Sequence, residues 1–122
     1  MVKKILFVDD NEVTLASIKE EIESMGYNVK TVTNGKQALK ILQQKSFDLV
    51  LLDMLMPGMS GIDVLKKIRA DKKLQNLKVA FLTVLDEIGI DKNIIEKLKP
   101  IAHIHKPVHF RNLKSQLDKI LK

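Results

Sequence analysis

Short apolar runs that alternate with amphipathic segments constrain the fold of this chain more than any other feature of its sequence. Runs that suit strands lie at residues 5–8, 29–32, 48–52, 79–82 and 101–105. Three of these segments contain four consecutive apolar residues, 5–8, 49–52 and 79–82, which is typical of strands that are buried on both faces, as in a parallel sheet. Five strands that alternate with five helices favour a sheet whose parallel strands are joined by right-handed crossover connections. The sequence therefore predicts an α/β fold, a (βα)5 sandwich of three layers around a parallel five-stranded sheet.

The segments between these runs carry apolar residues at helical spacing. Gly26 is expected to end the first helix as a C-cap, and Asn34-Gly35 is expected to lead into the second. The five predicted stripes are Leu15, Ile18, Ile22 and Met25; Ala38, Ile41 and Leu42; Ile62, Leu65 and Ile68; Ile90, Ile94 and Leu98; and Phe110, Leu113, Leu117 and Ile120.

Composition narrows the class of protein. A length of 122 residues suits one domain, residues 1–122, and the absence of cysteine excludes disulfides and thiolate chemistry. No apolar stretch is long enough to cross a membrane and no signal peptide is seen, so we expect a cytoplasmic protein without membrane insertion. The net charge of +6 could indicate a nucleic-acid partner. However, the lysines are interleaved with acids and stacking aromatics are lacking, so direct nucleic-acid binding is not expected.

Polar side chains stand where the predicted strands end. Asp9 and Asp10 follow the first run, Asp53 the third and Thr83 the fourth, and Lys106 follows the fifth. In open parallel sheets, ligands bind outside the carboxyl ends of the strands, which meet at one edge. We therefore expect three carboxylates, a hydroxyl and an ammonium group to gather at that edge.

This set of groups matches what phosphoryl transfer requires. Three close carboxylates repel one another, and a hard divalent cation such as Mg²⁺, which takes oxygen ligands, relieves that repulsion. A lysine supplies a point charge for a phosphoryl oxygen, and a threonine hydroxyl can donate a hydrogen bond to another. Asp53, at the end of the most apolar run, is the predicted oxygen nucleophile.

Four short motifs stand at these strand ends: FVDDN at residues 7–11, DMLMPGMSG at 53–61, LT at 82–83 and KP at 106–107. Present together and in this order, they make the chain resemble the receiver domain of two-component response regulators, in particular the stand-alone chemotaxis regulators. The resemblance covers essentially the whole chain as a single receiver domain. It implies a flavodoxin-like sheet with the strand order 2-1-3-4-5, which is taken from that family.

The resemblance also implies roles for the site residues. Asp53 would be the phosphoacceptor, taking a phosphoryl group from a phosphohistidine on a histidine kinase or phosphotransfer protein, or from a small phosphodonor. Asp10, Asp53 and the backbone carbonyl of Leu55 would bind Mg²⁺ directly, with Asp9 acting largely through water. Lys106 would pair with Asp53 and then with the phosphoryl group. Such a domain regulates other proteins, so activity as an enzyme beyond its own phosphorylation and dephosphorylation is not expected.

A conformational switch is a further implication of the resemblance. Thr83 would move to hydrogen-bond the phosphoryl group and so bias a two-state surface that a downstream protein target recognises. His103 occupies the position where receivers usually carry a switch tyrosine or phenylalanine, and Val84 replaces a usually small residue. Leu55 and Leu85 are apolar where the family often has polar residues that act on the attacking water, so we expect slow self-dephosphorylation.

Two other functions stay open at this point. The main alternative is a phosphate-independent receiver-like interaction module, which His103 and Val84 would permit. A phosphatase of the haloacid dehalogenase type is disfavoured, because it needs a second acid two residues after its nucleophile. Leu55 and Asn11 stand at the corresponding positions here.

Structural interpretations of single residues also stay open. Asp10 or Asn11 could serve as the N-cap of the first helix, a role compatible with metal binding nearby. His103, His105 and His109 could form a transition-metal site, but no carboxylate or cysteine stands at a matching spacing.

Overall fold

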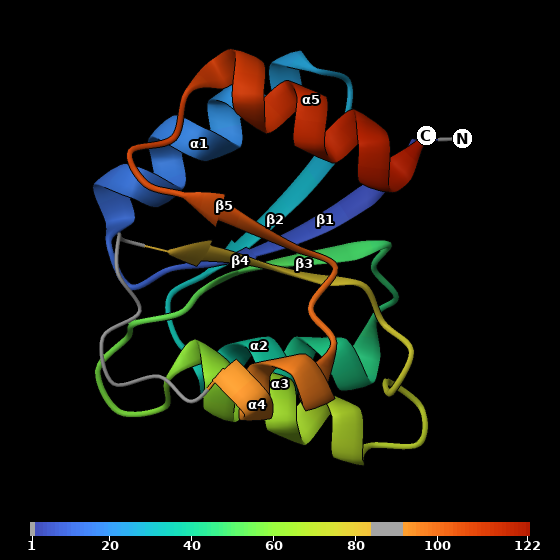
Figure 1. Ribbon diagram of the computed structural model, residues 1–122. Coiled ribbons are helices and arrows are strands. Elements are labelled where there is room, and N and C mark those ends of the chain that lie inside the picture. Colours follow the sequence, from blue (N-terminus) through green and yellow to red (C-terminus); the bar gives the residue numbers. More distant parts are fainter. Residues whose placement is uncertain (1, 84–91) are drawn as a thin grey trace.

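The predicted strands form one parallel sheet in a computed structural model, which describes residues 2–83 and 92–122 (Figure 1). The strands lie side by side in the order β2-β1-β3-β4-β5, and each neighbouring pair is parallel. The α/β class and the strand order implied by the resemblance are therefore confirmed. The strands are β1 (Lys4–Val8), β2 (Asn28–Val32), β3 (Leu49–Asp53), β4 (Val79–Thr83) and β5 (Ala102–His105).

Five helices complete the three layers. Figure 1 shows α1 and α5 on one face of the sheet and α2, α3 and α4 on the other. The helices are α1 (Glu12–Ser24), α2 (Gly35–Gln44), α3 (Gly61–Ala70), α4 (Lys92–Leu98) and α5 (Phe110–Leu121). Among the described residues, no helix combines the length and the apolar content that a membrane span requires.

The central strands are buried on both faces, as their continuous apolar runs predicted. In β1, Ile5 and Phe7 join the core beneath α1 and α5, whereas Leu6 and Val8 join the core beneath α2, α3 and α4. Every residue of β3 and β4 is buried. Because apolar side chains on each face pack against helices, the polar strand ends are held at fixed positions on the edge of the sheet.

Polar side chains set where the helices begin. Asn11 is the N-cap of α1 and accepts a hydrogen bond from the backbone N–H of Thr14, which settles the choice between Asp10 and Asn11. Asn34 caps α2 in the same way, and the helix begins at Gly35, as expected from the Asn34-Gly35 pair. At the other end of α1, Met25 is the C-cap. Gly26 follows it with a φ of 97°, a left-handed conformation that glycine adopts without steric cost.

Two of the predicted stripes were wrong in part. In α4 the buried residue is Ile95, whereas Ile94 is 37% exposed. The helix turns Ile95 and Leu98, rather than Ile94 and Leu98, toward the core. Ile90 lies outside the described residues. In α5 the buried residues are Leu113, Leu117 and Leu121, with spacings of four, and the predicted Ile120 is partly buried against the same core. Phe110 begins that helix and is 42% exposed, because it precedes the first turn that packs on the sheet.

Candidate functional site

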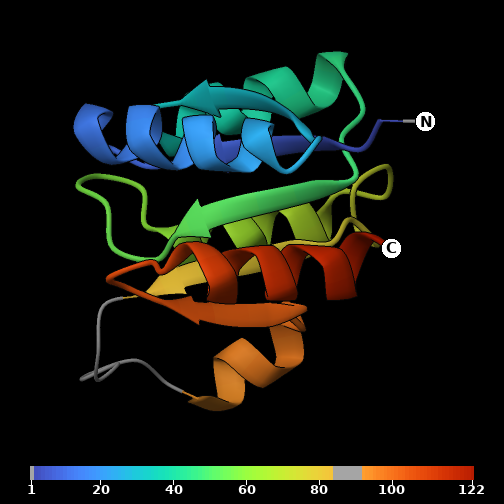
Figure 2. The same ribbon diagram turned by 90° about the horizontal axis from the view of Figure 1, so that it is seen from above.

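The carboxyl ends of four strands meet at one edge of the sheet. In Figure 2 the arrows of β3 and β5 point toward the same side of the molecule. One carboxylate oxygen each from Asp9, Asp10 and Asp53 lies within 4.8 Å of the other two. Asp9 and Asp53 are buried, whereas Asp10 is exposed, so the cluster opens to solvent on one side. The structure thus brings together the three carboxylates that the sequence analysis selected.

Lys106 is the cation that faces this cluster. Its Nζ lies 3.0 Å from Oδ2 of Asp9 and 3.6 Å from Oδ2 of Asp53. The ion pair expected with Asp53 is present, but Asp9 is the nearer partner. Asp9 is 0% exposed and its Oδ1 accepts a hydrogen bond from the backbone N–H of Asn11. A fully buried carboxylate needs such partners, because an unpaired charge in that position is strongly destabilising.

Asp53 lacks full compensation for its charge. Burial raises the pKa of Asp53 to about 6 from 3.8; repulsion from Asp9 adds to the rise, and attraction to Lys106 opposes it. The backbone N–H of Leu55 donates a hydrogen bond to Oδ1 of Asp53, which also favours the charged form. With three carboxylates facing Lys106, the site carries an excess of negative charge at neutral pH.

The donor set suits a hard divalent cation. Carboxylate oxygens are the ligands that Mg²⁺ prefers, and the exposed position of Asp10 leaves room for the waters that this ion retains. Within residues 2–83 and 92–122, no other group of three or more acidic, histidine or cysteine side chains comes close enough to share an ion. The three histidines near β5 therefore do not form a metal site among the described residues.

The loop after Asp53 is held by close backbone packing. A Cβ on Gly61 would lie 2.8 Å from the Cα of Met54 and would collide with the backbone oxygen of Asp53. The backbone N–H of Gly61 donates a hydrogen bond of 3.0 Å to the carbonyl of Met54. Only glycine permits this contact between the start of α3 and the end of β3. Within the loop, the side chain of Leu55 is 62% exposed beside the carboxylates.

Thr83 lies at the end of β4 and is 2% exposed. Its Oγ1 is 3.3 Å from Nδ1 of His105, its register partner on β5. His103, two residues earlier on β5, packs against Phe81 with ring centroids 5.8 Å apart. Val84 and Leu85, which the sequence analysis also selected, lie outside the described residues.

His105 is the residue near the site that sequence reasoning missed. It was considered only as part of a histidine metal site, and its contact with Thr83 depends on the register between β4 and β5. His103 and His105 are two residues apart on one strand, so their side chains point to the same face of the sheet. A prediction of the strand register would have been needed to pair His105 with Thr83.

Comparisons with known proteins agree with this geometry. A family-wide sequence model of the response regulator receiver domain matches residues 5–118. The chain is 38% identical over 120 residues to chemotaxis protein CheY-3 of Vibrio cholerae, covering 96% of this chain and 90% of that protein. It is 34% identical to sporulation initiation phosphotransferase F of Bacillus subtilis, covering 99% of this chain and 95% of that protein.

A solved structure shows the same fold. It is the receiver domain of a sensor histidine kinase from Pseudomonas aeruginosa, with a magnesium ion coordinated in its active-site cleft. Its TM-score against this structure is 0.86 at 26% identity, covering 98% of this chain and 97% of that one.

Proposed function

The chain belongs to the response regulator receiver domains of two-component signalling, and on that premise we propose that Asp53 is its phosphoacceptor. One observation carries the proposal: Asp53 is a buried carboxylate, with a raised pKa, that faces both an acidic pair and Lys106. The donor would be a phosphohistidine on a histidine kinase or phosphotransfer protein, or a small phosphodonor. Residues 1–122 would act as one receiver domain in the cytoplasm.

The proposed step is an in-line transfer to a carboxylate oxygen. An Oδ atom of Asp53 bonds to phosphorus while the phosphorus–nitrogen bond to the donor imidazole breaks, and the electron pair stays on that nitrogen. Lys106 is close enough to Asp53 to face the phosphoryl oxygens that arrive there. Burial of Asp53 strengthens this interaction, because water screens it less. The reaction modifies the domain itself, so its output is regulation rather than turnover of a substrate.

Mg²⁺ is the cofactor we propose for this site. Asp10, Asp53 and the backbone carbonyl of Leu55 would bind it directly, and Asp9, which Lys106 already engages, would act through water. When bound, the ion neutralises oxygen charge on the carboxylates and on the phosphoryl group. The magnesium ion in the Pseudomonas aeruginosa receiver domain supports this assignment.

Phosphorylation would be communicated through Thr83 and His103. We propose that the hydroxyl of Thr83 donates a hydrogen bond to a phosphoryl oxygen. We also propose that His103 takes the switch position next to Phe81, on the face of the sheet covered by α4. The resulting shift between two states would change the affinity for a downstream protein target. A phosphate-independent interaction module is disfavoured, because the acidic pair, Asp53, Thr83 and Lys106 are all in place.

Intact mass spectrometry tests the proposal. The protein is incubated with acetyl phosphate, with and without Mg²⁺, beside the variant Asp53→Asn. We expect a Mg²⁺-dependent gain of one phosphoryl group in the natural sequence and none in the variant. Failure to gain mass, with a histidine-kinase donor also tried, would refute the phosphoacceptor role and favour the phosphate-independent module.

A further inference from the structure

The hydroxyl of Thr83 already has a partner in the unphosphorylated protein. Thr83 and His105 are directly opposite each other in the β4–β5 ladder, so their side chains lie on the same face of the sheet. The distance from Oγ1 to Nδ1 is 3.3 Å. Because Thr83 is 2% exposed, its hydroxyl depends on protein atoms rather than bulk water for hydrogen bonding.

The position of His105 opposes the movement that phosphorylation requires. In the sheet order, β4 lies between β3, which carries Asp53, and β5, which carries His105. When the neutral imidazole carries its proton on Nε2, Nδ1 accepts the single hydroxyl proton of Thr83, which is then not available to a phosphoryl oxygen. In that tautomer, Thr83 must give up its contact with β5 to donate to a phosphoryl group on Asp53.

We propose that His105 is a positioning residue that holds Thr83 toward β5 in the unphosphorylated state and so sets part of the free-energy cost of switching. This inference rests on the proposed function, since it concerns the step in which Thr83 leaves for the phosphoryl group. In this role His105 acts through its contact with Thr83.

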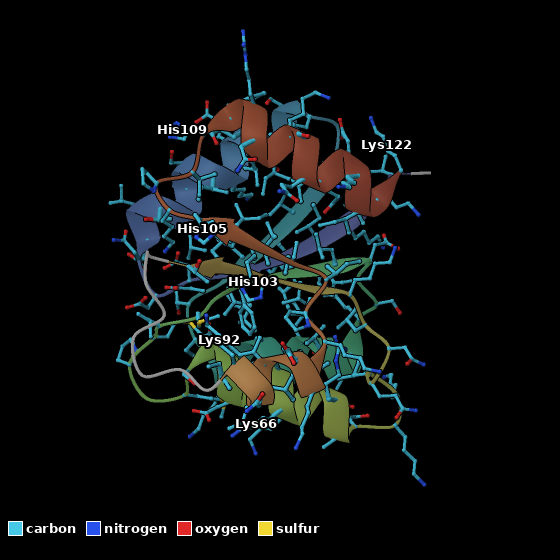
Figure 3. All side chains as sticks on the ribbon, in the orientation of Figure 1. Lys66, Lys92, His103, His105, His109 and Lys122 are labelled. Atoms are coloured by element: carbon cyan, nitrogen blue, oxygen red, sulfur yellow. The ribbon has the colours of Figure 1, made fainter. Side chains whose placement is uncertain are left out.

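His105 can release Thr83 without leaving a buried polar atom unpaired. Its side chain is exposed and borders a cavity of about 360 Å³, which Lys92, Ile95, Glu96 and His103 also line. Figure 3 labels His103 and His105 along β5 and Lys92 on the neighbouring α4. When Thr83 departs, water in this cavity can hydrogen-bond the imidazole, so the cost of release is that of one ordinary hydrogen bond rather than of an unsatisfied buried group.

The first measurement uses the metal-free protein. Nuclear magnetic resonance of the Thr83 side-chain carbons should show a changed Thr83 environment in His105→Val, and the His105 ring nitrogens of the natural sequence should show that Nδ1 accepts a hydrogen bond. His109→Val is the matched control: His109 is exposed, its side chain caps nothing, and its extended backbone suits valine. Unchanged Thr83 signals in His105→Val would overturn the contact on which the inference depends.

The second measurement uses beryllofluoride, a phosphoryl mimic, with Mg²⁺. Loss of one hydrogen bond from the resting state should let His105→Val bind it roughly 2- to 10-fold more tightly, while His109→Val binds as the natural sequence does. His105→Asn, whose amide oxygen can replace Nδ1 as an acceptor, should restore the natural affinity. If the His105→Val variant does not fold, His105→Asn provides the second variant for this measurement.

A double-mutant cycle separates positioning from a general effect on β5. In a Thr83→Ala background, replacing His105 by Val should no longer change the affinity for beryllofluoride. An unchanged affinity in His105→Val alone, or an equal gain in both backgrounds, would overturn the inference and leave the proposed function intact. If the natural sequence bound no beryllofluoride and gained no phosphoryl group, the proposed function would fail, and the inference with it.

Discussion

Replacing Asp53 by Asn should stabilise the metal-free protein at neutral pH while removing the proposed phosphoacceptor. Asp53 is 5% exposed, and the pKa of its carboxyl group is raised to about 6, mainly by burial. A rise of about two pKa units corresponds to on the order of 3 kcal/mol of unfavourable free energy in the ionised folded state. Asn removes that charge, and its side-chain oxygen can still accept the hydrogen bond from Leu55 N–H.

The pH dependence has a definite sign. Below pH 3.8, Asp53 is protonated in both the folded and the unfolded protein, and it contributes no penalty. Between 3.8 and about 6 the unfolded chain loses this proton more readily than the folded protein, so stability falls as the pH rises. Above about 6 the penalty is complete. The difference in unfolding free energy between the variant and the natural sequence should therefore grow by about 2.5 kcal/mol from pH 4 to pH 8, since part of the penalty is already present at pH 4.

Urea unfolding in a chelator, followed by circular dichroism at several pH values, measures this difference. Asp10→Asn is the matched control, since Asp10 belongs to the same cluster but is exposed. Its effect on the unfolding free energy should be well under half that of Asp53→Asn. Added Mg²⁺ should stabilise the natural sequence more than the Asp53→Asn variant. Equal stability of the two proteins at every pH would refute the conclusion that burial of Asp53 is inadequately compensated.

Two further substitutions test other parts of the site. Lys106→Met should lower the unfolding free energy by on the order of 2 kcal/mol, because it leaves the buried Asp9 without its ion pair 3.0 Å away; unchanged urea denaturation would contradict that pairing. Leu55→Asn, which places an amide beside Asp53, should shorten the lifetime of the phosphorylated form several-fold by positioning the attacking water. Mass spectrometry after removal of the phosphodonor follows this decay, and a lifetime equal to that of the natural sequence would count against the role of an apolar Leu55.

The positions of the acidic residues were predictable because the backbone geometry of a parallel sheet leaves little choice. Each carboxylate follows an apolar run, and parallel strands end at a common edge, so sequence order alone placed Asp9, Asp10 and Asp53 together. The nearer partner of Lys106 was not predictable in this way. It depends on side-chain distances of 3.0 and 3.6 Å, and differences of that size arise from packing rather than from the spacing of motifs.

Helix α4 was less predictable for a related reason. Its described part, Lys92–Leu98, has seven residues, too few for a sequence stripe to define which side faces the sheet, and Ile95 rather than Ile94 packs into the core. The contact of Thr83 with His105 was equally hidden, because a shift of one residue between β4 and β5 would have placed Ile104 opposite Thr83 instead. Both features depend on contacts between elements, which a single sequence specifies only through the whole fold.

The charge balance of the site links its stability to its proposed function. A receiver that fully neutralised Asp53 with fixed cations would be more stable, but it would have little electrostatic attraction left for Mg²⁺ or for a phosphoryl group. Here Lys106 engages Asp9 more closely than Asp53, so the carboxylate proposed as the acceptor is the group left short of positive charge. A bound cation would reduce the cost of burying ionised Asp53 further than Lys106 does, so we expect ion binding to stabilise the protein. Asp53→Asn should therefore gain stability and respond less to Mg²⁺, as two consequences of a single missing charge.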